Sequence, residues 1–151
     1  MLNYLAPLLL LCNGLAAGVL FGTQLGGFPY LASLPTDRYV HAHAFFGQRY
    51  DPAMPVCLIA TVVLDVVLAL SGNGTGARTL FALAALLAAA TALISVTKNA
   101  PVNRWMRTID PQNIPADFRD PRHAWGLWNK RRSLLTITAL VVNCAALGLL
   151  L

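Results

Sequence analysis

Residues 79–96 have the sequence TLFALAALLAAATALISV, a run of 18 residues without a single charged side chain. As an α-helix this run would be about 27 Å long. That length is close to the ~30 Å thickness of the hydrocarbon core of a bilayer. The apolar residues are continuous instead of alternating with polar ones, and this pattern is typical of a helix surrounded by lipid. The run therefore predicts a membrane-spanning helix.

Three further apolar blocks flank this one, and the composition of the whole chain agrees with them. Hydrophobic residues make up 57% of the 151 residues and charged residues only 11%, whereas soluble domains carry about 25% charged residues. We expect an all-α fold, an integral membrane four-helix bundle with cytoplasmic interfacial loops, formed by residues 1–151 as a single domain. The expected spans cover approximately residues 4–34, 54–70, 79–97 and 122–151.

The basic residues predict the orientation of the bundle. Four spans place the loops 35–52 and 98–132 on the same side, and these loops hold ten of the eleven Lys and Arg residues; only Arg78 lies on the other side. Because positive charge concentrates in cytoplasmic loops, we expect both loops in the cytoplasm and both termini outside, in the plasma membrane. The net charge of +5 is then a topology signal, and we expect no nucleic-acid partner.

Small residues follow one face of the first apolar block. Glycines recur every fourth residue at Gly14, Gly18, Gly22 and Gly26. Such a stripe lets another helix approach closely. It predicts helix packing within the bundle, and it also offers a surface for a homo-oligomer.

A polar and aromatic stripe opens the fourth helix. Trp125, Trp128, Asn129 and Arg132 have the i, i+3, i+4, i+7 spacing of one helical face. Two indoles, an amide and a guanidinium on one face could line a flat aromatic pocket, because Arg stabilises anionic oxygens and stacks on rings. The alternative is an interfacial anchor of tryptophans and snorkelling basic side chains.

Two asparagines flank Pro101, which we expect to end the third helix and to start a short interfacial helix. The side chains of Asn99 and Asn103 can satisfy freed backbone groups or bind a ligand carbonyl. In the first helix Gln24 lies on the same face as Asn13. Asp65 is the one ionisable group at membrane depth, which makes it either a functional residue or a structural partner of Asn13 or Asn143.

The histidines allow a metal hypothesis. His41 and His43 share a face if the chain is extended there, and His123 could supply a third ligand. No carboxylate or cysteine stands at a familiar ligand spacing, so we expect no metal site; if there is one, these histidines would form it.

These landmarks together resemble the anthrone oxygenase-like family of membrane proteins. The resemblance covers most of the chain and rests on four parts of the sequence: Gly27-Phe28-Pro29, Met54-Pro55, Asn99-Ala100-Pro101-Val102-Asn103 and Trp125-Gly126-Leu127-Trp128-Asn129-Lys130-Arg131-Arg132. Many members carry His at the position of Asn129, so this chain departs from the family there. A histidine base at that position is therefore not available.

The resemblance implies a four-helix bundle and an oxidoreductase activity. Characterised relatives oxidise anthrones to anthraquinones with molecular oxygen in polyketide biosynthesis, as monooxygenases without an obvious cofactor. For this chain it implies a hydrophobic aromatic substrate, with Arg132 as partner of the oxyanion and His43 as the base. Asn99 and Asn103 would orient the substrate, Trp125 and Trp128 would stack on it, and Gln24 and Asn129 would bind it.

Three other functions remain open from the sequence. The chain could be a small noncatalytic membrane protein, a membrane oxidase dependent on a histidine-bound metal or haem, or a transporter that uses Asp65. The transporter has the least support, because no inverted repeat is evident.

Overall fold

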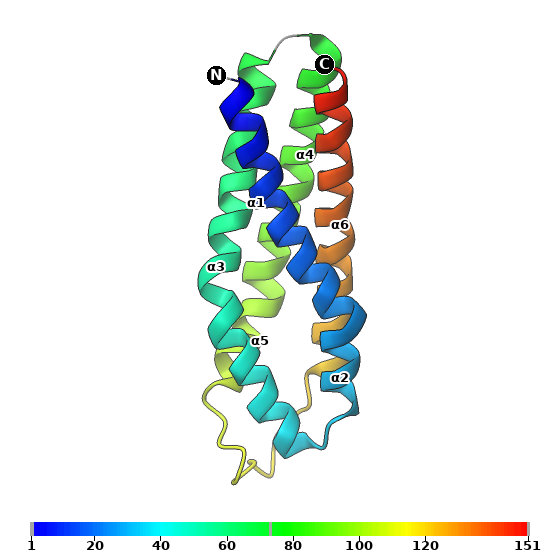
Figure 1. The fold of residues 1–151 in the computed structure, drawn as a ribbon. Coiled ribbons are helices and arrows are strands. Elements are labelled where there is room, and N and C mark those ends of the chain that lie inside the picture. Colours follow the sequence, from blue (N-terminus) through cyan, green and yellow to red (C-terminus); the bar gives the residue numbers. More distant parts are fainter. Residues whose placement is uncertain (1, 73, 151) are drawn as a thin grey trace.

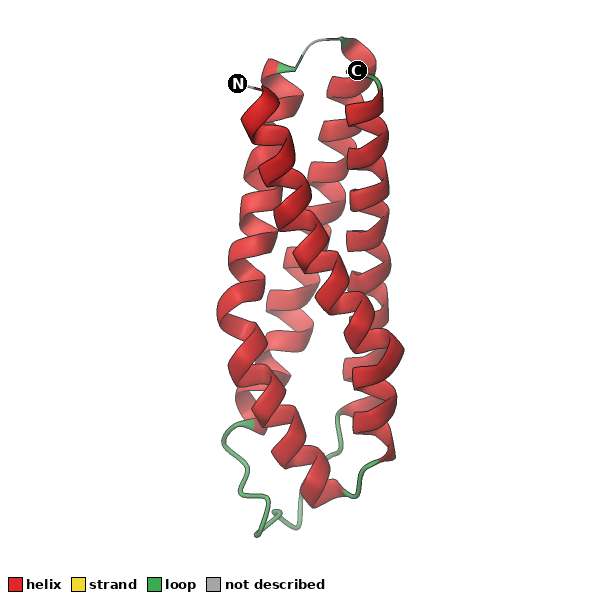
Figure 2. Cartoon of the chain, viewed as in Figure 1, coloured by secondary structure: helices red, strands yellow, loops and turns green. Residues whose placement is uncertain are grey.

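Four long helical rods run side by side along the whole molecule (Figure 1). The computed structural model describes residues 2–72 and 74–150, and in these residues it contains helices, turns and loops but no strands (Figure 2). The first rod consists of α1 (Leu2–Gly22), a π-helical turn (Thr23–Gly27) and α2 (Phe28–Ser33), and the second is α3 (Thr36–Ser71). The third consists of α4 (Thr75–Ile94), a π-helical turn (Ser95–Asn99) and α5 (Ala100–Met106), and the fourth is α6 (Arg122–Gly148).

Three of the rods are long and apolar enough to cross a membrane: Tyr4–Ser33, Thr36–Ser71 and Thr75–Met106. The fourth rod, α6, is not among them; all of its charged side chains lie in its first half, and its second half is largely apolar. These helices are compatible with an integral membrane protein. Both termini and the turn before α4 lie at one end of the bundle, and the segment between α5 and α6 lies at the other (Figure 1). Which end faces the cytoplasm stays a prediction.

The prediction of a loop at residues 35–52 is wrong, because α3 begins at Thr36 and continues through Pro52 and Pro55 to Ser71. The first part of α3 is amphipathic: its buried residues include Tyr39, Val40, His43 and Gly47, which lie on one helical face. Because polar residues cover its other face, this part of α3 does not form an apolar block in the sequence. At 36 residues, α3 is about 54 Å long, so it extends beyond the hydrocarbon core.

The prediction that a short helix starts at Pro101 is confirmed, but the third rod continues into that helix without a break. The rod widens into a π-helical turn, in which the N–H of Ala100 donates to the carbonyl of Ser95, and Pro101 then lies in the first turn of α5. Proline is tolerated there because its missing N–H would have no helical partner anyway. The first rod repeats this arrangement, since the N–H of Phe28 donates to the carbonyl of Thr23 just before Pro29. Isolated π-turns of this kind are frequent at functional sites.

The half of the bundle that holds the termini is an apolar core with a polar layer beneath it. Leu9, Leu68, Phe81 and Ala146, one from each rod, are fully buried together. In the polar layer the amide of Asn143 donates to Asn13 Oδ1 at 3.1 Å and to Asp65 Oδ2 at 3.4 Å. The predicted contact between Asp65 and Asn143 is therefore present. A layer of polar contacts of this kind favours one register of the helices.

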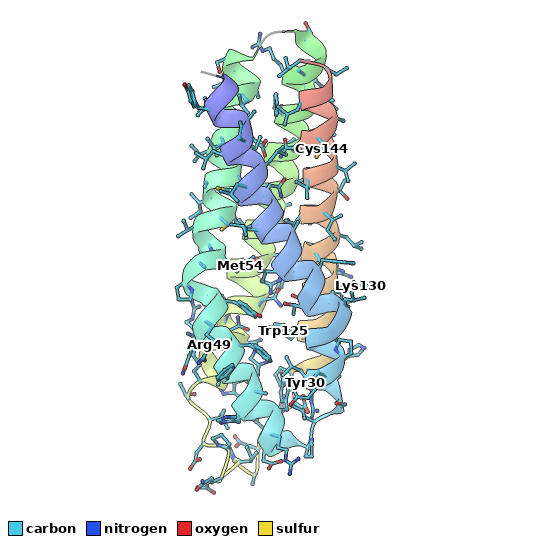
Figure 3. All side chains as sticks on the ribbon, viewed as in Figure 1. Tyr30, Arg49, Met54, Trp125, Lys130 and Cys144 are labelled. Carbon is cyan, nitrogen blue, oxygen red and sulfur yellow. The ribbon has the colours of Figure 1, made fainter. Side chains whose placement is uncertain are left out.

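The other half of the bundle is closed by the connecting segment 107–121. Ile109, Ile114 and Phe118 from this segment pack on a buried cluster that contains Leu31, Tyr39, Val40 and Met106. This contact covers the end of the bundle where most charged side chains lie. Figure 3 places Trp125 between the helices in this half and Lys130 on the outside.

We expected the glycine stripe to pack against another helix of the bundle, but it does not. A Cβ atom added at Gly14, Gly18, Gly22 or Gly26 would meet no described atom within 4 Å. The close helix contact is instead at Gly126, where an added Cβ would lie 2.0 Å from Cζ of Phe28. The aromatic ring of Phe28 therefore occupies the space that the missing side chain leaves. A homo-oligomer through the glycine stripe stays a prediction.

We expect Gly126→Ala to destabilise the bundle, because the new methyl group must displace the ring of Phe28. Overpacking of this kind costs about 1–3 kcal/mol. Gly18→Ala is the matched control, since it gains the same helix propensity, about 1 kcal/mol, without a steric contact. Thermal unfolding in detergent, followed by circular dichroism, compares the two. Equal melting temperatures would contradict the tight packing of Phe28 against α6.

Candidate functional site

A cavity of about 210 Å³ opens between the first rod, α3 and α6 in the charged half of the bundle. It is larger than the ~150 Å³ apolar cavity that is known to hold benzene. Its wall combines aromatic and small residues with four polar side chains that could meet a ligand: His43, Asp51, Asn103 and Arg132. The aromatic part of the wall comes from Phe46, Tyr50 and Trp125.

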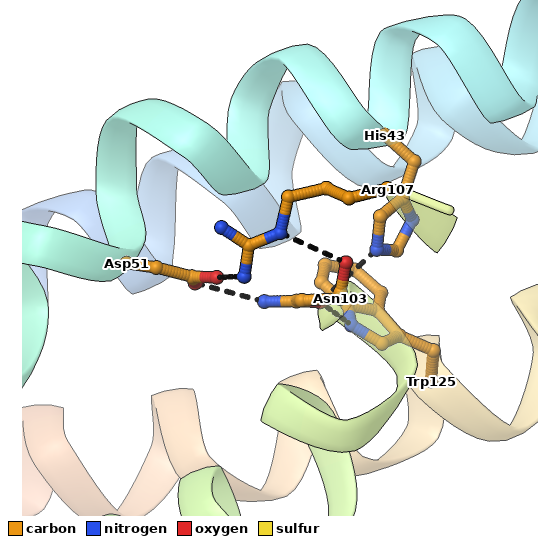
Figure 4. A network of polar contacts seen from close by, with 5 residues as sticks. All are labelled: His43, Asp51, Asn103, Arg107 and Trp125. Carbon is orange, nitrogen blue, oxygen red and sulfur yellow. Dashed lines mark hydrogen bonds and ion pairs between the residues drawn. The ribbon is translucent and has the colours of Figure 1, made fainter. Parts of the chain in front are cut away.

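The side-chain amide of Asn103 is the centre of the polar wall (Figure 4). Its oxygen accepts the indole N–H of Trp125 at 2.8 Å and lies 3.0 Å from Nε2 of His43. Its nitrogen donates to Oδ1 of Asp51 at 2.9 Å, and Arg107 donates to the other carboxylate oxygen at 2.7 Å. The network thus connects α3, α5 and α6.

These partners determine the orientation of the amide and the tautomer of His43. An indole N–H can only donate, and an ionised carboxylate can only accept. The amide oxygen of Asn103 must therefore face Trp125, and its nitrogen must face Asp51. Because Nε2 of His43 approaches that oxygen, Nε2 carries the proton and donates it. The lone pair of the imidazole is then on Nδ1, which is buried and has no partner among the described residues.

Arg132 lies on the same wall and is held by neutral groups. Its Nε and one terminal nitrogen donate to Oδ1 of Asn129 at 3.1 and 2.9 Å, and the other terminal nitrogen donates to Oγ of Ser95 at 3.3 Å. Asn129 is oriented in turn by donating to Oε1 of Gln24 at 3.1 Å. The salt bridges of the described residues involve Arg107 and Arg122 and not Arg132. A partly buried cation without an anionic partner is a site where a ligand anion would be stabilised.

A second cavity, of about 310 Å³, lies on the other side of this wall, between α3 and the third rod. Its lining includes Ile59 and Val96, which are largely exposed on the outer surface of the bundle. Four residues line both cavities: Asp51, Met54, Asn103 and Arg132. These shared residues form a partition, and the polar groups on it can be approached from two sides.

Arg122 joins the elements at the closed end of the bundle. Its guanidinium donates to the carbonyl of Leu34 at 2.6 Å, pairs with Asp120 at 2.6 Å and lies 4.5 Å from the ring centre of Tyr39. Burial alone would raise the pKa of Asp120, but the hydrogen bonds and the charge of Arg122 bring it below its ordinary value. Arg122 thereby links the start of α6 to the residue after α2. It also contacts Tyr39, which lies one helical turn before His43 in α3.

The structure brings four of the predicted site residues onto one cavity: His43, Asn103, Trp125 and Arg132. Gln24 and Asn129 orient Arg132. Asn99 is fully buried and donates to the carbonyl of Trp125 at 3.2 Å, so it supports the indole and lines neither cavity.

Two other groups of predicted residues lie elsewhere. Trp128 is outside the cavity, where its ring lies near Lys98 and Arg131, at 5.2 and 4.5 Å from the ring centre. His41 lines a separate hollow near Tyr30, and His123 is exposed. No cluster of three or more histidine, cysteine or acidic side chains that could hold a metal ion occurs among the residues that the structure describes. The three histidines are therefore not brought together.

Three residues that line the cavity were not predicted as site residues: Phe46, Tyr50 and Asp51. They lie in the segment that was predicted to be a loop. One signal could have identified Asp51. The chain has only six acidic residues, and Asp51 directly precedes the predicted start of the second span, at the end of the bundle that is rich in arginine. Asp51 was therefore one of the acids placed to pair with the basic residues at that end.

The fold and the site together define an all-helical protein of membrane type, whose polar chemistry surrounds a cavity at one end of a four-rod bundle. The sequence model of the anthrone oxygenase family matches residues 42–142, about two thirds of the chain, and the chain belongs to this family. The match includes four polar side chains of the cavity wall: His43, Asp51, Asn103 and Arg132. The searches of curated proteins and of solved structures each gave no match.

We expect Asn103→Ala to lower the free energy of unfolding by about 2–3 kcal/mol, because it leaves buried partners such as the indole N–H of Trp125 unsatisfied. Asn113→Ala is the control, since Asn113 is exposed in the connecting segment. Denaturant unfolding in detergent, followed by tryptophan fluorescence, measures both. Loss of the same size in the two variants would contradict the central role of Asn103.

Proposed function

We propose that the chain is a membrane-bound oxygenase that oxidises an anthrone-like or other polycyclic phenolic substrate with molecular oxygen, in the biosynthesis of a natural product such as a polyketide. Membership of the anthrone oxygenase family supports oxygenase-like chemistry in general. The observation that carries the proposal for this chain is the guanidinium of Arg132, which lines an aromatic cavity and has only neutral partners.

The proposed reaction balances with O2 as its one co-reactant. An anthrone has a methylene group between two aromatic rings, opposite a carbonyl. Loss of a methylene proton places negative charge on the carbonyl oxygen, and the resulting electron-rich anion reacts with O2 at the methylene carbon. Elimination of water then leaves a second carbonyl, so one oxygen atom enters the product and one becomes water. We therefore propose no cofactor beyond O2.

Arg132 would stabilise the oxyanion that forms in the first step. Stabilising charge as it develops in a site sheltered from water is generally the largest contribution to this type of catalysis. The guanidinium is pre-oriented by Asn129 and Ser95, so it would not need to reorganise when the charge appears. Trp125, Phe46 and Tyr50 supply flat surfaces for the ring system.

The location of the cavity suits an apolar substrate. Its lining includes Gly22, Thr23 and Gly27 from the first rod and Met54 from α3. A flat aromatic molecule partitions into the bilayer and would reach the cavity between these two rods. The substrate would then lie with its oxygen toward Arg132, at the end of the bundle that we assign to the cytoplasm.

Oxygen uptake by detergent-purified protein supplied with simple anthrones tests this function. We expect uptake above the spontaneous rate, and about a 100-fold loss in Arg132→Ala, the size of effect found when one oxyanion donor is removed. Arg132→Lys should retain part of the rate, because it keeps the charge but not the planar donor geometry. Arg131→Ala is the control, since Arg131 is exposed and lies against Trp128 outside the cavity.

Metal analysis and an absorption spectrum of the same sample separate the alternatives. Uptake that requires a stoichiometric metal or haem would replace this proposal with a metal-dependent oxidase. Wild-type protein that accelerates none of the anthrones would favour a noncatalytic membrane protein. Size-exclusion profiles of all variants ensure that a lost rate does not reflect lost folding.

A further inference from the structure

We propose that the carboxylate of Asp51 is the base that removes the substrate proton, and that His43 is a positioning residue that holds Asn103. This inference rests on the proposed function and assigns a catalytic group within the same site. It starts from the hydrogen bonds drawn in Figure 4, which leave the two candidate bases in different states.

His43 has no nitrogen with which to accept a proton from the cavity. Its Nε2 already carries a proton, which it donates to the amide oxygen of Asn103 at 3.0 Å. Its Nδ1 holds the free lone pair, but this atom is buried and is not in contact with open space. The ring is also enclosed by Tyr39 and Trp125, with ring centres 5.4 and 5.0 Å away. The contacts of His43 are those of a group that fixes its neighbours.

Asp51 has the access that His43 lacks. It is the one carboxylate among the described residues that line either of the two cavities at Arg132. Its side chain is 29% exposed, and it lies on the partition that both cavities share. A base on this partition would act next to Arg132, which would receive the negative charge that deprotonation creates.

Two hydrogen bonds orient the carboxylate of Asp51, and they leave about half of its lone-pair positions free. Asn103 donates to Oδ1 and Arg107 donates to Oδ2. A carboxylate has about four lone-pair positions, so each oxygen keeps one position for a substrate proton. His43 and Trp125 hold the amide of Asn103, and Asn103 in turn holds Asp51. This chain of contacts explains why His43 matters without reacting.

Asp51 can carry the proton through a complete reaction. It first accepts one methylene proton; an electron then passes from the substrate anion to O2, and the two radicals combine to form the new C–O bond. The protonated Asp51 returns its proton to the terminal oxygen, which gives a hydroperoxide. It next accepts the remaining hydrogen on that carbon as a proton, the C=O bond forms as the O–O bond breaks, and the departing hydroxide takes the proton from Asp51 as water.

Deuterium exchange without oxygen tests the assignment, because it isolates the proton-transfer step. Purified protein is incubated anaerobically with anthrone in D2O, and exchange of the methylene hydrogens is followed by mass spectrometry against a protein-free blank. We expect at least a 100-fold loss of protein-dependent exchange in Asp51→Asn, a typical effect of removing a general base, and partial rescue in Asp51→Glu. Quenching of tryptophan fluorescence by anthrone should show that Asp51→Asn still binds.

His43→Gln and Asp110→Asn complete the experiment. A glutamine amide can still donate to Asn103, so we expect His43→Gln to keep exchange within about tenfold of wild type, a small effect beside the loss of a general base. Asp110 lies in the connecting segment, away from both cavities, and Asp110→Asn should exchange like wild type.

The outcomes distinguish this inference from the proposed function. If wild-type protein accelerates exchange but Asp51→Asn does so equally well, or if His43→Gln abolishes exchange while Asp51→Asn keeps it, the assignment of the base is wrong and the oxygenase proposal stands. If the wild-type protein accelerates neither exchange nor oxygen uptake with any anthrone, the proposed function itself is wrong.

Discussion

The amide of Asn103 is the contact on which the site depends, because it joins three of the four rods through groups of fixed hydrogen-bonding type. It accepts from α6 at Trp125, contacts α3 at His43 and Asp51, and belongs to α5. In a sheltered environment a polar group without a partner is costly, so each of these side chains restricts the others. An aspartate in place of Asn103 would face Asp51 with like charge, and a leucine would leave the indole N–H without an acceptor. An amide, which both donates and accepts, meets both demands at this position.

Arg132, in contrast, is a cation without a salt-bridge partner among the described residues. Three of its five N–H donors are bonded to the side chains of Asn129 and Ser95, and these bonds hold the guanidinium against the bundle. Dipoles orient a cation but do not neutralise it, so the site retains an affinity for negative charge. Asp51 could have served as a counter-ion, yet it is paired with Arg107. Asp51 forms a salt bridge with Arg107 and not with Arg132, so the two arginines have different partners although they line the same cavity.

Long apolar runs made the bundle predictable, and residues on one helical face made part of the site predictable. The start of α6, the common wall of Trp125 and Arg132, and the bond between Asp65 and Asn143 follow from spacing and from the cost of buried polar groups. The helical start of α3 did not follow, because Pro52 and Pro55 resemble helix boundaries in a sequence, whereas tertiary packing of Tyr39 and Val40 stabilises the helix before them. The spacing also predicted that Trp128 lines the same pocket as Trp125. In the structure Trp128 lies outside the cavity, near Lys98 and Arg131. Asp51 was missed together with its helix.

The two halves of the bundle differ in what they bury: one holds an apolar core cluster and the other holds the cavities. The half with the termini buries apolar side chains from all four rods and ends in the polar layer around Asn143. The half with the cavities contains both π-helical turns. Buried polar atoms without partners in the described chain occur in both halves: Nδ1 of His43 and Oδ1 of Asn99 near the cavities, and Oδ1 of Asp65 and of Asn143 in the polar layer. Such groups lower stability. Each π-turn ends two residues before a proline. The two turns contain Gln24 and Ser95, which contact Arg132 directly or through Asn129. The prolines, the π-turns and the neutral partners of the arginine therefore occur at the same end of the molecule.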